Sequence, residues 1–329
     1  MNKSVLVNGT FRSGSGAVND YLSSRKDFTN PLGDNEFRIV SDPMGLQNLF
    51  NICYKDPGLL SSAYAFQEFQ RYIFNLQKYT VYLSPGVKGK LYKKNLLNFK
   101  DEFIKKVTKL SYYAMPHYSR VNLNFRENVK YSLALKLKKE NPETKLRNII
   151  IPKEKNFFLK KAKIYIKKVI HNSTIHKIKN KNIVLNNSID IFNSIESSKF
   201  FNNPKIIIVI RDPRDIFSSM KIGKAAAAPN YDVKIFVNWY KHFFCGNEFN
   251  KILNNKKVFT IIFENFVNNF DKENEKLCKF LGINKKFQLK NNNTFNLEIS
   301  KKNVGKSKKN LSKYEIQYIE KKLSQYLKW

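Results

Sequence analysis

Short apolar runs alternate with amphipathic segments along the chain, and this alternation predicts strands and helices in turn. The runs at Val5–Val7, Ile183–Leu185, Ile206–Ile210 and Val258–Phe263 are apolar on consecutive positions and rich in β-branched residues. Such runs favour strands that are buried on both faces of a parallel sheet. A further strand is predicted at Phe37–Val40, before a turn-prone stretch.

Amphipathic segments lie between these strands. Val18, Tyr21 and Leu22 recur at helical spacing after the first strand, and a capping box at Ser312 and Glu315 marks the start of the last helix. The pattern from about residue 45 to 180 is mostly helical. We therefore expect an α/β fold, with a parallel sheet flanked by helices and a helical insertion after the second strand, in one domain over residues 1–329.

The chain is strongly basic, with a formal net charge of +34 at pH 7. Residues 86–181 contain 26 Lys and Arg against 6 Asp and Glu, so a polyanionic partner would dock on the insertion. The chain is also rich in Lys, Asn, Ile, Phe and Tyr together, a bias that AT-rich coding produces without any binding role. Both explanations of the charge stay open.

The three cysteines, Cys53, Cys245 and Cys278, are far apart and form no CxxC pair. This spacing argues against a disulfide framework and against a zinc site. No stretch approaches the ~20 apolar residues that span a bilayer. We therefore expect a cytoplasmic protein, soluble or peripherally bound to a membrane.

A loop rich in glycine and serine, Gly9–Gly16, follows the first strand directly and precedes the first helix. Backbone N–H groups of such a loop, together with the positive end of the helix dipole, form a concave site for a phosphate. The spacing of Gly9 and Gly14 matches the first half of a Walker A loop, but Ser15 and Gly16 replace the Lys and Ser/Thr that bind nucleotide and Mg²⁺. Arg12 supplies the positive charge instead.

A second candidate anion site lies at the end of the strand at Ile206–Ile210. Arg211 emerges there, Asp212 and Pro213 are suited to begin a helix, and Ser219 lies two turns along it. The carboxyl ends of parallel strands form the ligand-binding edge of such a sheet, where the first loop also lies. A plain ion pair of Arg211 with Asp215 would explain the arginine without any ligand.

These two motifs resemble those of the sulfotransferase family that uses 3′-phosphoadenosine 5′-phosphosulfate (PAPS). Residues 12–15, Arg-Ser-Gly-Ser, resemble its 5′-phosphosulfate loop, and residues 211–215 with Ser219 resemble its 3′-phosphate motif. Residues 260–266, the Phe-Leu-Gly at 280–282 and the glycine-basic stretch at 303–306 are similar to later family marks. The resemblance covers residues 1–24 and 181–329 and implies a P-loop NTPase-like three-layer fold; residues 50–180 resemble no family motif.

The resemblance implies sulfuryl transfer from PAPS to a hydroxyl or amine, without a metal. It implies that the 5′-phosphosulfate is held by Arg12, Ser13, Gly14, Ser15, Gly16 and Ala17. Arg211 and Ser219 would hold the 3′-phosphate, over which Gly305 and Lys306 would close. Many members have a hydroxyl residue where Gly16 stands, so one side-chain hydrogen bond is missing here.

The acceptor must also lose its proton, which requires a base beside the transferred group. Glu36 is our prediction, because it lies at the entry to the predicted second strand; Asp42 and His117 are the alternatives. The alternative without a catalytic role is that Glu36 is a solvated carboxylate in a loop.

The basic insertion favours an acidic glycan or glycolipid as acceptor and a peripheral contact with a membrane, and no nucleic acid is expected. A kinase-like phosphotransferase and a non-catalytic polyanion-binding relative are the alternative functions.

Overall fold

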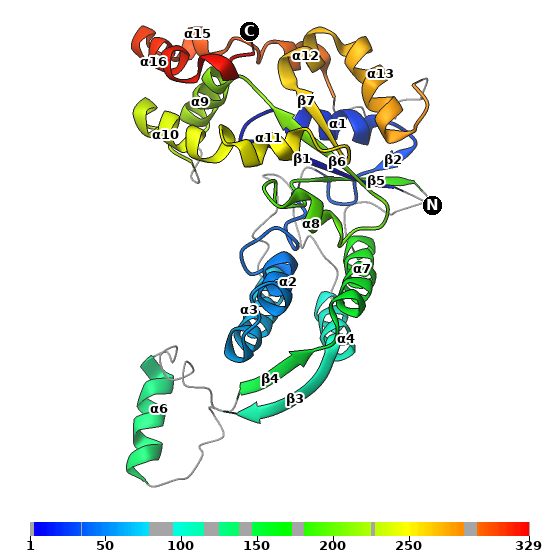
Figure 1. Cartoon of the computed structure of the whole chain (residues 1–329), viewed down its shortest axis with the longest axis vertical. Helices are drawn as coiled ribbons and strands as arrows, with labels where there is room; N and C mark the ends of the chain where they lie inside the picture. Colours follow the sequence, from blue (N-terminus) through cyan, green and yellow to red (C-terminus); the bar gives the residue numbers. More distant parts are fainter. Residues whose placement is uncertain are drawn as a thin grey trace.

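The computed structural model describes residues 3–33, 35–78, 95–114, 125–137, 147–172, 181–224, 228–285 and 295–328. Its centre is a five-stranded sheet in the order β2-β5-β1-β6-β7, in which all neighbouring strands are parallel (Figure 1). The strands are β1 (Ser4–Gly9), β2 (Phe28–Thr29), β5 (Asn182–Asn186), β6 (Pro204–Ile210) and β7 (Val258–Ile262). The expected α/β class is confirmed.

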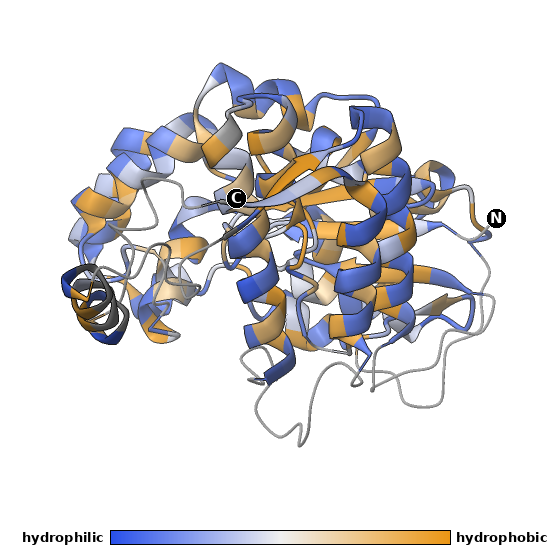
Figure 2. Ribbon diagram, turned by 90° about the horizontal axis from the view of Figure 1, so that it is seen from below, coloured by the Kyte–Doolittle hydropathy of each residue, from blue (hydrophilic) through white to orange (hydrophobic). Residues whose placement is uncertain are grey.

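Side chains of the central strands are buried on both faces of the sheet, as their sequence predicts. Val7 and Ile207 face one layer, formed by α1 (Ser15–Ser24), α12 (Phe263–Asn268) and α13 (Phe270–Leu281). Leu6 and Ile208 face the other, where α2 (Leu46–Tyr54), α3 (Leu59–Lys78) and α7 (Lys155–His171) pack. The strands accordingly form the hydrophobic centre of the ribbon in Figure 2.

A third group of helices packs beside the sheet around its own apolar cluster. It contains α9 (Pro213–Ile222), α10 (Val233–Phe244), α11 (Asn247–Leu253) and α16 (Lys313–Leu323). Short helices α8 (Ser194–Ser198), α14 (Leu297–Lys301), α15 (Ser307–Asn310) and η2 (Ser324–Tyr326) complete the connections. The capping box of Ser312 with Glu315 and the N-cap of α9 at Asp212 are both present, so these local predictions are confirmed.

The strand predicted at Phe37–Val40 is wrong, because this segment forms a turn. The carbonyls of Ile39 and Val40 accept hydrogen bonds from Leu46 N (2.9 Å) and Gln47 N (3.1 Å) at the start of α2. Phe37, Ile39 and Val40 are all buried, which is why their sequence resembles a strand. The second strand is instead β2, only two residues long.

The insertion is mostly helical but also contains an antiparallel pair of strands that the sequence did not suggest. Besides α2, α3 and α7 it holds α4 (Leu96–Val107) and α6 (Phe125–Lys136), with β3 (Thr108–Ala114) paired to β4 (Arg147–Pro152). Leu110 and Tyr113 of β3 are exposed, so the strand lacks the buried alternation that would have revealed it. Figure 1 shows β3, β4 and α6 at the end of the molecule farthest from the main sheet.

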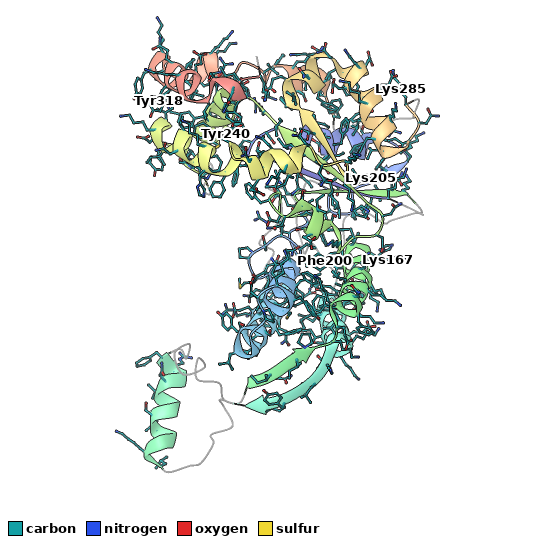
Figure 3. The ribbon with its side chains drawn as sticks, viewed as in Figure 1. Lys167, Phe200, Lys205, Tyr240, Lys285 and Tyr318 are labelled. Atoms are coloured by element: carbon teal, nitrogen blue, oxygen red, sulfur yellow. The ribbon has the colours of Figure 1, made fainter. Side chains whose placement is uncertain are left out.

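The insertion shares its core with the sheet. Phe200, labelled in Figure 3, is fully buried between the two, and its ring centroid lies 5.6 Å from that of Phe50 in α2. The same cluster contains Leu6 of β1 and Phe158 of α7. This continuity supports our proposal that residues 1–329 form a single domain. Among the described residues, no helix is long and apolar enough to cross a membrane.

Candidate active site

The loop between β1 and α1 brings the start of a helix to the carboxyl edge of the sheet. Helix α1 begins after Gly14, which has φ 90° and gives no side-chain cap, and the first turn holds no acidic residue. Phe11 (φ 24°) and Arg12 (φ 50°) also have positive φ, which curls the loop around its own amides. The first N–H groups of a helix need acceptors, so this loop is suited to an anion.

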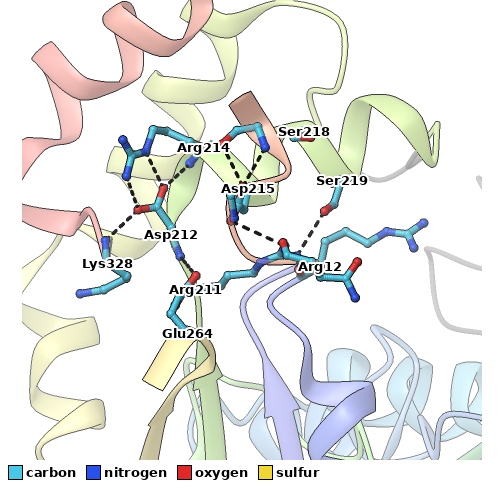
Figure 4. Close-up of polar contacts among 12 residues, drawn as sticks. Arg12, Arg211, Asp212, Arg214, Asp215, Ser218, Ser219, Glu264 and Lys328 are labelled. Carbon is cyan, nitrogen blue, oxygen red and sulfur yellow. Dashed lines mark hydrogen bonds and ion pairs between the residues drawn. The ribbon is translucent and has the colours of Figure 1, made fainter. Parts of the chain in front are cut away.

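Arg211 joins the two motifs that are far apart in sequence. Its side chain is buried, with only 4% of the residue exposed, and Nη1 donates to the carbonyl of Arg12 at 3.0 Å, 199 positions away (Figure 4). The same nitrogen donates to Oγ of Ser219 at 3.2 Å, and Nη2 donates to the carbonyl of Asn303. The guanidinium lies over the ring of Phe263, 5.1 Å from its centroid. Among the described residues, Nε of Arg211 has no hydrogen-bond partner.

Acidic side chains surround this buried charge. Burial lowers the pKa of Arg211, while Asp215, Glu264 and Asp212 act in the opposite direction. Burial also raises the pKa of Glu264, whose Oε1 accepts from the backbone N–H of Asp212 at 2.9 Å. An arginine stays protonated under such conditions, so the carboxylates offset the cost of burying its charge.

Asp215 does more than pair with Arg211. The ion pair between them is long, 3.8 Å, whereas the Asp215 carboxylate accepts short bonds from Gly305 N (2.8 Å), Ser307 N (2.9 Å) and Ser307 Oγ (2.8 Å). These bonds tie the loop at residues 303–307 to α9. A simple capping pair, the plain explanation from sequence, therefore does not describe the arrangement.

A cavity of about 1100 Å³ lies between these segments. Most of the predicted site residues line it: Arg12, Gly14, Ser15, Gly16, Ala17, Glu36, Arg211, Ser219 and Lys306. Ser13 is buried beneath the loop, and Gly305 holds the neighbouring loop in place through Asp215.

The far wall of the cavity comes from residues that the sequence had not suggested. Asn187, Asp190 and Ile191 follow β5 and line the cavity, as does Ile222 at the end of α9. Only their place after a strand of the parallel sheet could have pointed to the first three, because strand ends form the ligand edge.

Glu36 is held by two partners in this cavity. Nδ2 of Asn187 donates to Oε1 at 2.5 Å, and Nη1 of Arg38 donates to Oε2 at 3.3 Å. Asp42 is buried away from the cavity, where it accepts from Nε of Arg38 (2.7 Å) and the hydroxyl of Tyr72 (2.8 Å). His117 lies outside the described residues.

Comparison with known families identifies the family of this chain. A model described as "Sulfotransferase family" matches residues 114–287, more than half of the chain. The chain belongs to the sulfotransferase family. The match contains Arg211 and Ser219 and also residues 114–180, a segment in which the sequence motifs had shown no resemblance.

Solved sulfotransferases resemble this one only distantly. The sulfotransferase domain from the curacin biosynthetic pathway has 12% identity and a TM-score of 0.40, with 98% of each chain covered. The sulfotransferase from Alicyclobacillus acidocaldarius has 10% identity and a TM-score of 0.39 over 94% of this chain and 95% of its own. The domain from the Synechococcus PCC 7002 olefin synthase has 12% identity and a TM-score of 0.38 over 86% and 74%. No curated protein matches the sequence.

The sulfotransferase shows no cluster of three or more His, Cys, Asp or Glu side chains suited to a metal ion within the described ranges. The charged side chains that line its cavity are those of Arg12, Arg38, Arg211, Lys306, Glu36 and Asp190.

Proposed function

We propose that this sulfotransferase uses PAPS as its donor. The backbone amides at the start of α1, which has no side-chain cap, and the guanidinium of Arg12 fit the 5′-phosphosulfate. The cradle would be formed by the cavity-lining residues Arg12, Gly14, Ser15, Gly16 and Ala17, with Ser13 buried in the same loop. Arg211 and Ser219 fit the 3′-phosphate. The observation that carries this assignment is the contact of Arg211 with both the Arg12 carbonyl and Ser219, because it supports two anion sites in one cavity.

The 303–307 loop would complete the 3′-phosphate site. Asp215 fixes the loop through Gly305 and Ser307, and Lys306 lines the cavity beside them. We propose that Lys306 adds a second positive charge to this subsite and that the Gly305 segment closes over the phosphate. The guanidinium of Arg211 would then exchange its bond with the Asn303 carbonyl for a stronger one with a phosphate oxygen.

Sulfuryl transfer is an in-line displacement that depends on positioning and on stabilising negative charge, as phosphoryl transfer does. We propose that Arg12 stabilises the leaving phosphate oxygen and that Glu36 accepts the proton of the acceptor hydroxyl or amine. Asn187 and Arg38 hold the Glu36 carboxylate at the cavity wall. Asp42 is the weaker candidate for the base, because it is not among the residues that line the cavity and its oxygens accept from Arg38 and Tyr72.

The basic insertion has a different role in this proposal. None of the described residues of α2, α3, α4, α6 or α7 lines the cavity. We therefore propose that its lysines serve a peripheral contact with an anionic surface, such as a membrane or an acidic glycolipid, in a cytoplasmic protein. This role requires no nucleic acid.

Calorimetry with 3′,5′-adenosine bisphosphate (PAP) and with AMP tests the donor. PAP should bind much more tightly, because each charge-assisted bond to the 3′-phosphate contributes ~1.5–3 kcal/mol. Ser219→Ala removes one such bond and should weaken PAP binding by about tenfold while leaving AMP unchanged. Arg211→Ala should weaken PAP by at least as much, but it also frees the 303–307 loop, so Ser219→Ala is the cleaner variant. Equal affinity of the parent for PAP and AMP would refute the donor assignment.

Turnover with PAPS tests the base. Glu36→Gln should lose 10²–10⁴-fold in rate, as expected on removing a general base, and should hold PAP nearly as well as the parent. Arg12→Ala should damage both turnover and binding. Near-normal turnover of Glu36→Gln, with loss in Asp42→Asn or His117→Ala, would move the base to one of those residues.

A further inference from the structure

A row of aromatic side chains runs outward from the cavity. The ring of Phe11 lines the cavity and meets Trp239 of α10 edge-on, with centroids 5.5 Å apart. Trp239 contacts Phe243 at 6.0 Å, and Phe243 contacts Phe192 at 5.7 Å. We call these four residues, Phe11, Trp239, Phe243 and Phe192, the aromatic strip.

The strip is unusually exposed for large apolar side chains. Phe11, Phe243 and Phe192 are 42%, 40% and 39% exposed, and Ile222 at the cavity mouth is 59% exposed. Single exposed apolar residues are common, but a connected row that leads out of a polar cavity is typical of a binding surface.

Phe11 is also held in an uncommon backbone conformation. Its φ of 24° is rare for a residue with a bulky side chain and has an energetic cost, which proteins tolerate mainly at functional sites. The loop places the aromatic ring of Phe11 against Trp239, although glycine would adopt this φ at a lower conformational free energy.

Both ends of the strip are next in sequence to residues that line the cavity. Phe11 is the neighbour of Arg12, the residue that we assign to the leaving group. Phe192 follows Asp190 and Ile191, which line the cavity, in the same loop as Asn187, the partner of Glu36. An acceptor whose hydroxyl lies between Arg12 and Glu36 would therefore have its remaining atoms beside the strip.

We propose that the aromatic strip is an acceptor subsite for a hydroxyl compound that carries an aryl group. The inference rests on the proposed function. Aromatic rings bind other rings in edge-to-face or offset geometry, and the strip offers ring edges and faces, whereas it has no charged group for a sulfated or carboxylated chain. In the reaction the hydroxyl oxygen forms a bond to sulfur and the bond from sulfur to the phosphate oxygen breaks. PAP leaves, the sulfate ester of the aryl compound forms and the proton passes to Glu36.

Trp239 provides a direct reporter of binding. The sequence contains two tryptophans, Trp239 and Trp329, so Trp329→Phe leaves Trp239 as the single fluorophore. Titration of this variant with 4-nitrophenol, with and without saturating PAP, should quench the emission of Trp239. In the same background, Phe192→Ala and Phe243→Ala should each raise the dissociation constant about threefold to tenfold, the range expected for loss of one ring contact.

Tyr314→Ala is the matched control, because Tyr314 is 55% exposed and contacts a single ring, that of Tyr318 on α16, among the ring pairs found in the described residues. Its affinity for 4-nitrophenol should equal that of the background. If Phe243→Ala does not fold, Phe243→Leu keeps an apolar contact without the ring and should give the same loss. The inference is wrong if 4-nitrophenol does not quench, if the strip variants bind like the control, or if octyl glucoside or a heparin disaccharide binds more tightly.

Calorimetry on the same proteins separates this inference from the proposed function. Absence of PAP binding would refute the PAPS assignment. The titration with 4-nitrophenol in the absence of PAP would still show whether the aromatic strip binds an aryl compound. Normal PAP binding without binding of 4-nitrophenol would refute the acceptor subsite alone and leave the PAPS assignment intact.

Discussion

Replacing Gly14 by alanine adds one methyl group at the point where α1 begins. Gly14 has φ 90°, a conformation that costs a residue with a side chain about 1–2 kcal/mol. The new Cβ would also lie only 2.3 Å from Cδ2 of the Phe263 ring, so the ring or the loop must move. Overpacking of this kind costs about 1–3 kcal/mol. Together the two effects predict a loss of ~2–5 kcal/mol in the free energy of unfolding.

Gly16→Ala is the matched control in the same loop. A Cβ at Gly16 would meet nothing within 4 Å, and the residue lies inside α1. Alanine in a helix is about 0.5–1 kcal/mol more favourable than glycine, so this variant should be at least as stable as the parent.

Urea unfolding of the three proteins without nucleotide, followed by circular dichroism, measures the difference. A displaced Phe263 would also disturb Arg211, which lies over its ring, so Gly14→Ala should bind PAP more weakly by calorimetry. The same unfolding free energy for Gly14→Ala and Gly16→Ala would refute the loop geometry on which the anion site depends.

Three further predictions concern the supports of the site. Asp215→Asn replaces one carboxylate oxygen, which accepts a hydrogen bond from the 303–307 loop, by an amide donor and should lower the free energy of unfolding by ~3 kcal/mol. Glu320→Gln is the control: its ion pair with Arg214 is partly exposed, so this variant should cost less than ~1 kcal/mol. Equal urea midpoints for the two variants would contradict the prediction. Burial raises the pKa of Glu264 in the folded state above its unfolded value, so the folded protein binds this proton more tightly and loses stability as pH rises between the two values. Relative to Glu264→Gln, the melting temperature of the parent should therefore fall as pH rises above about 4.5, and a constant difference would show that burial does not govern this carboxyl. Turnover with PAPS should persist in EDTA, and a strict Mg²⁺ requirement would favour a kinase-like reaction instead.

Local patterns in the sequence predict several features of this protein well. Consecutive β-branched residues predict β5 and β6 as strands buried on both faces, and the caps at Asp212 and Ser312 mark two helix starts. Each of these features depends on residues a few positions apart, through side-chain periodicity or a hydrogen bond to the next turn. The anion loop and the position of Arg211 after β6 follow from the same short-range rules, combined with the common edge at which parallel strands end.

Packing between distant segments decided the remaining features. Phe37–Val40 has the composition of a strand, but its carbonyls accept from the start of α2 and it forms a turn. From the sequence, Asp215 is interpreted as an ion-pair partner of Arg211. In the structure it also accepts a hydrogen bond from Ser307, which lies 92 positions along the chain. The aromatic strip likewise joins three segments that share no pattern in sequence. Such contacts depend on how whole layers pack against one another, so no window of neighbouring residues contains the information that determines them.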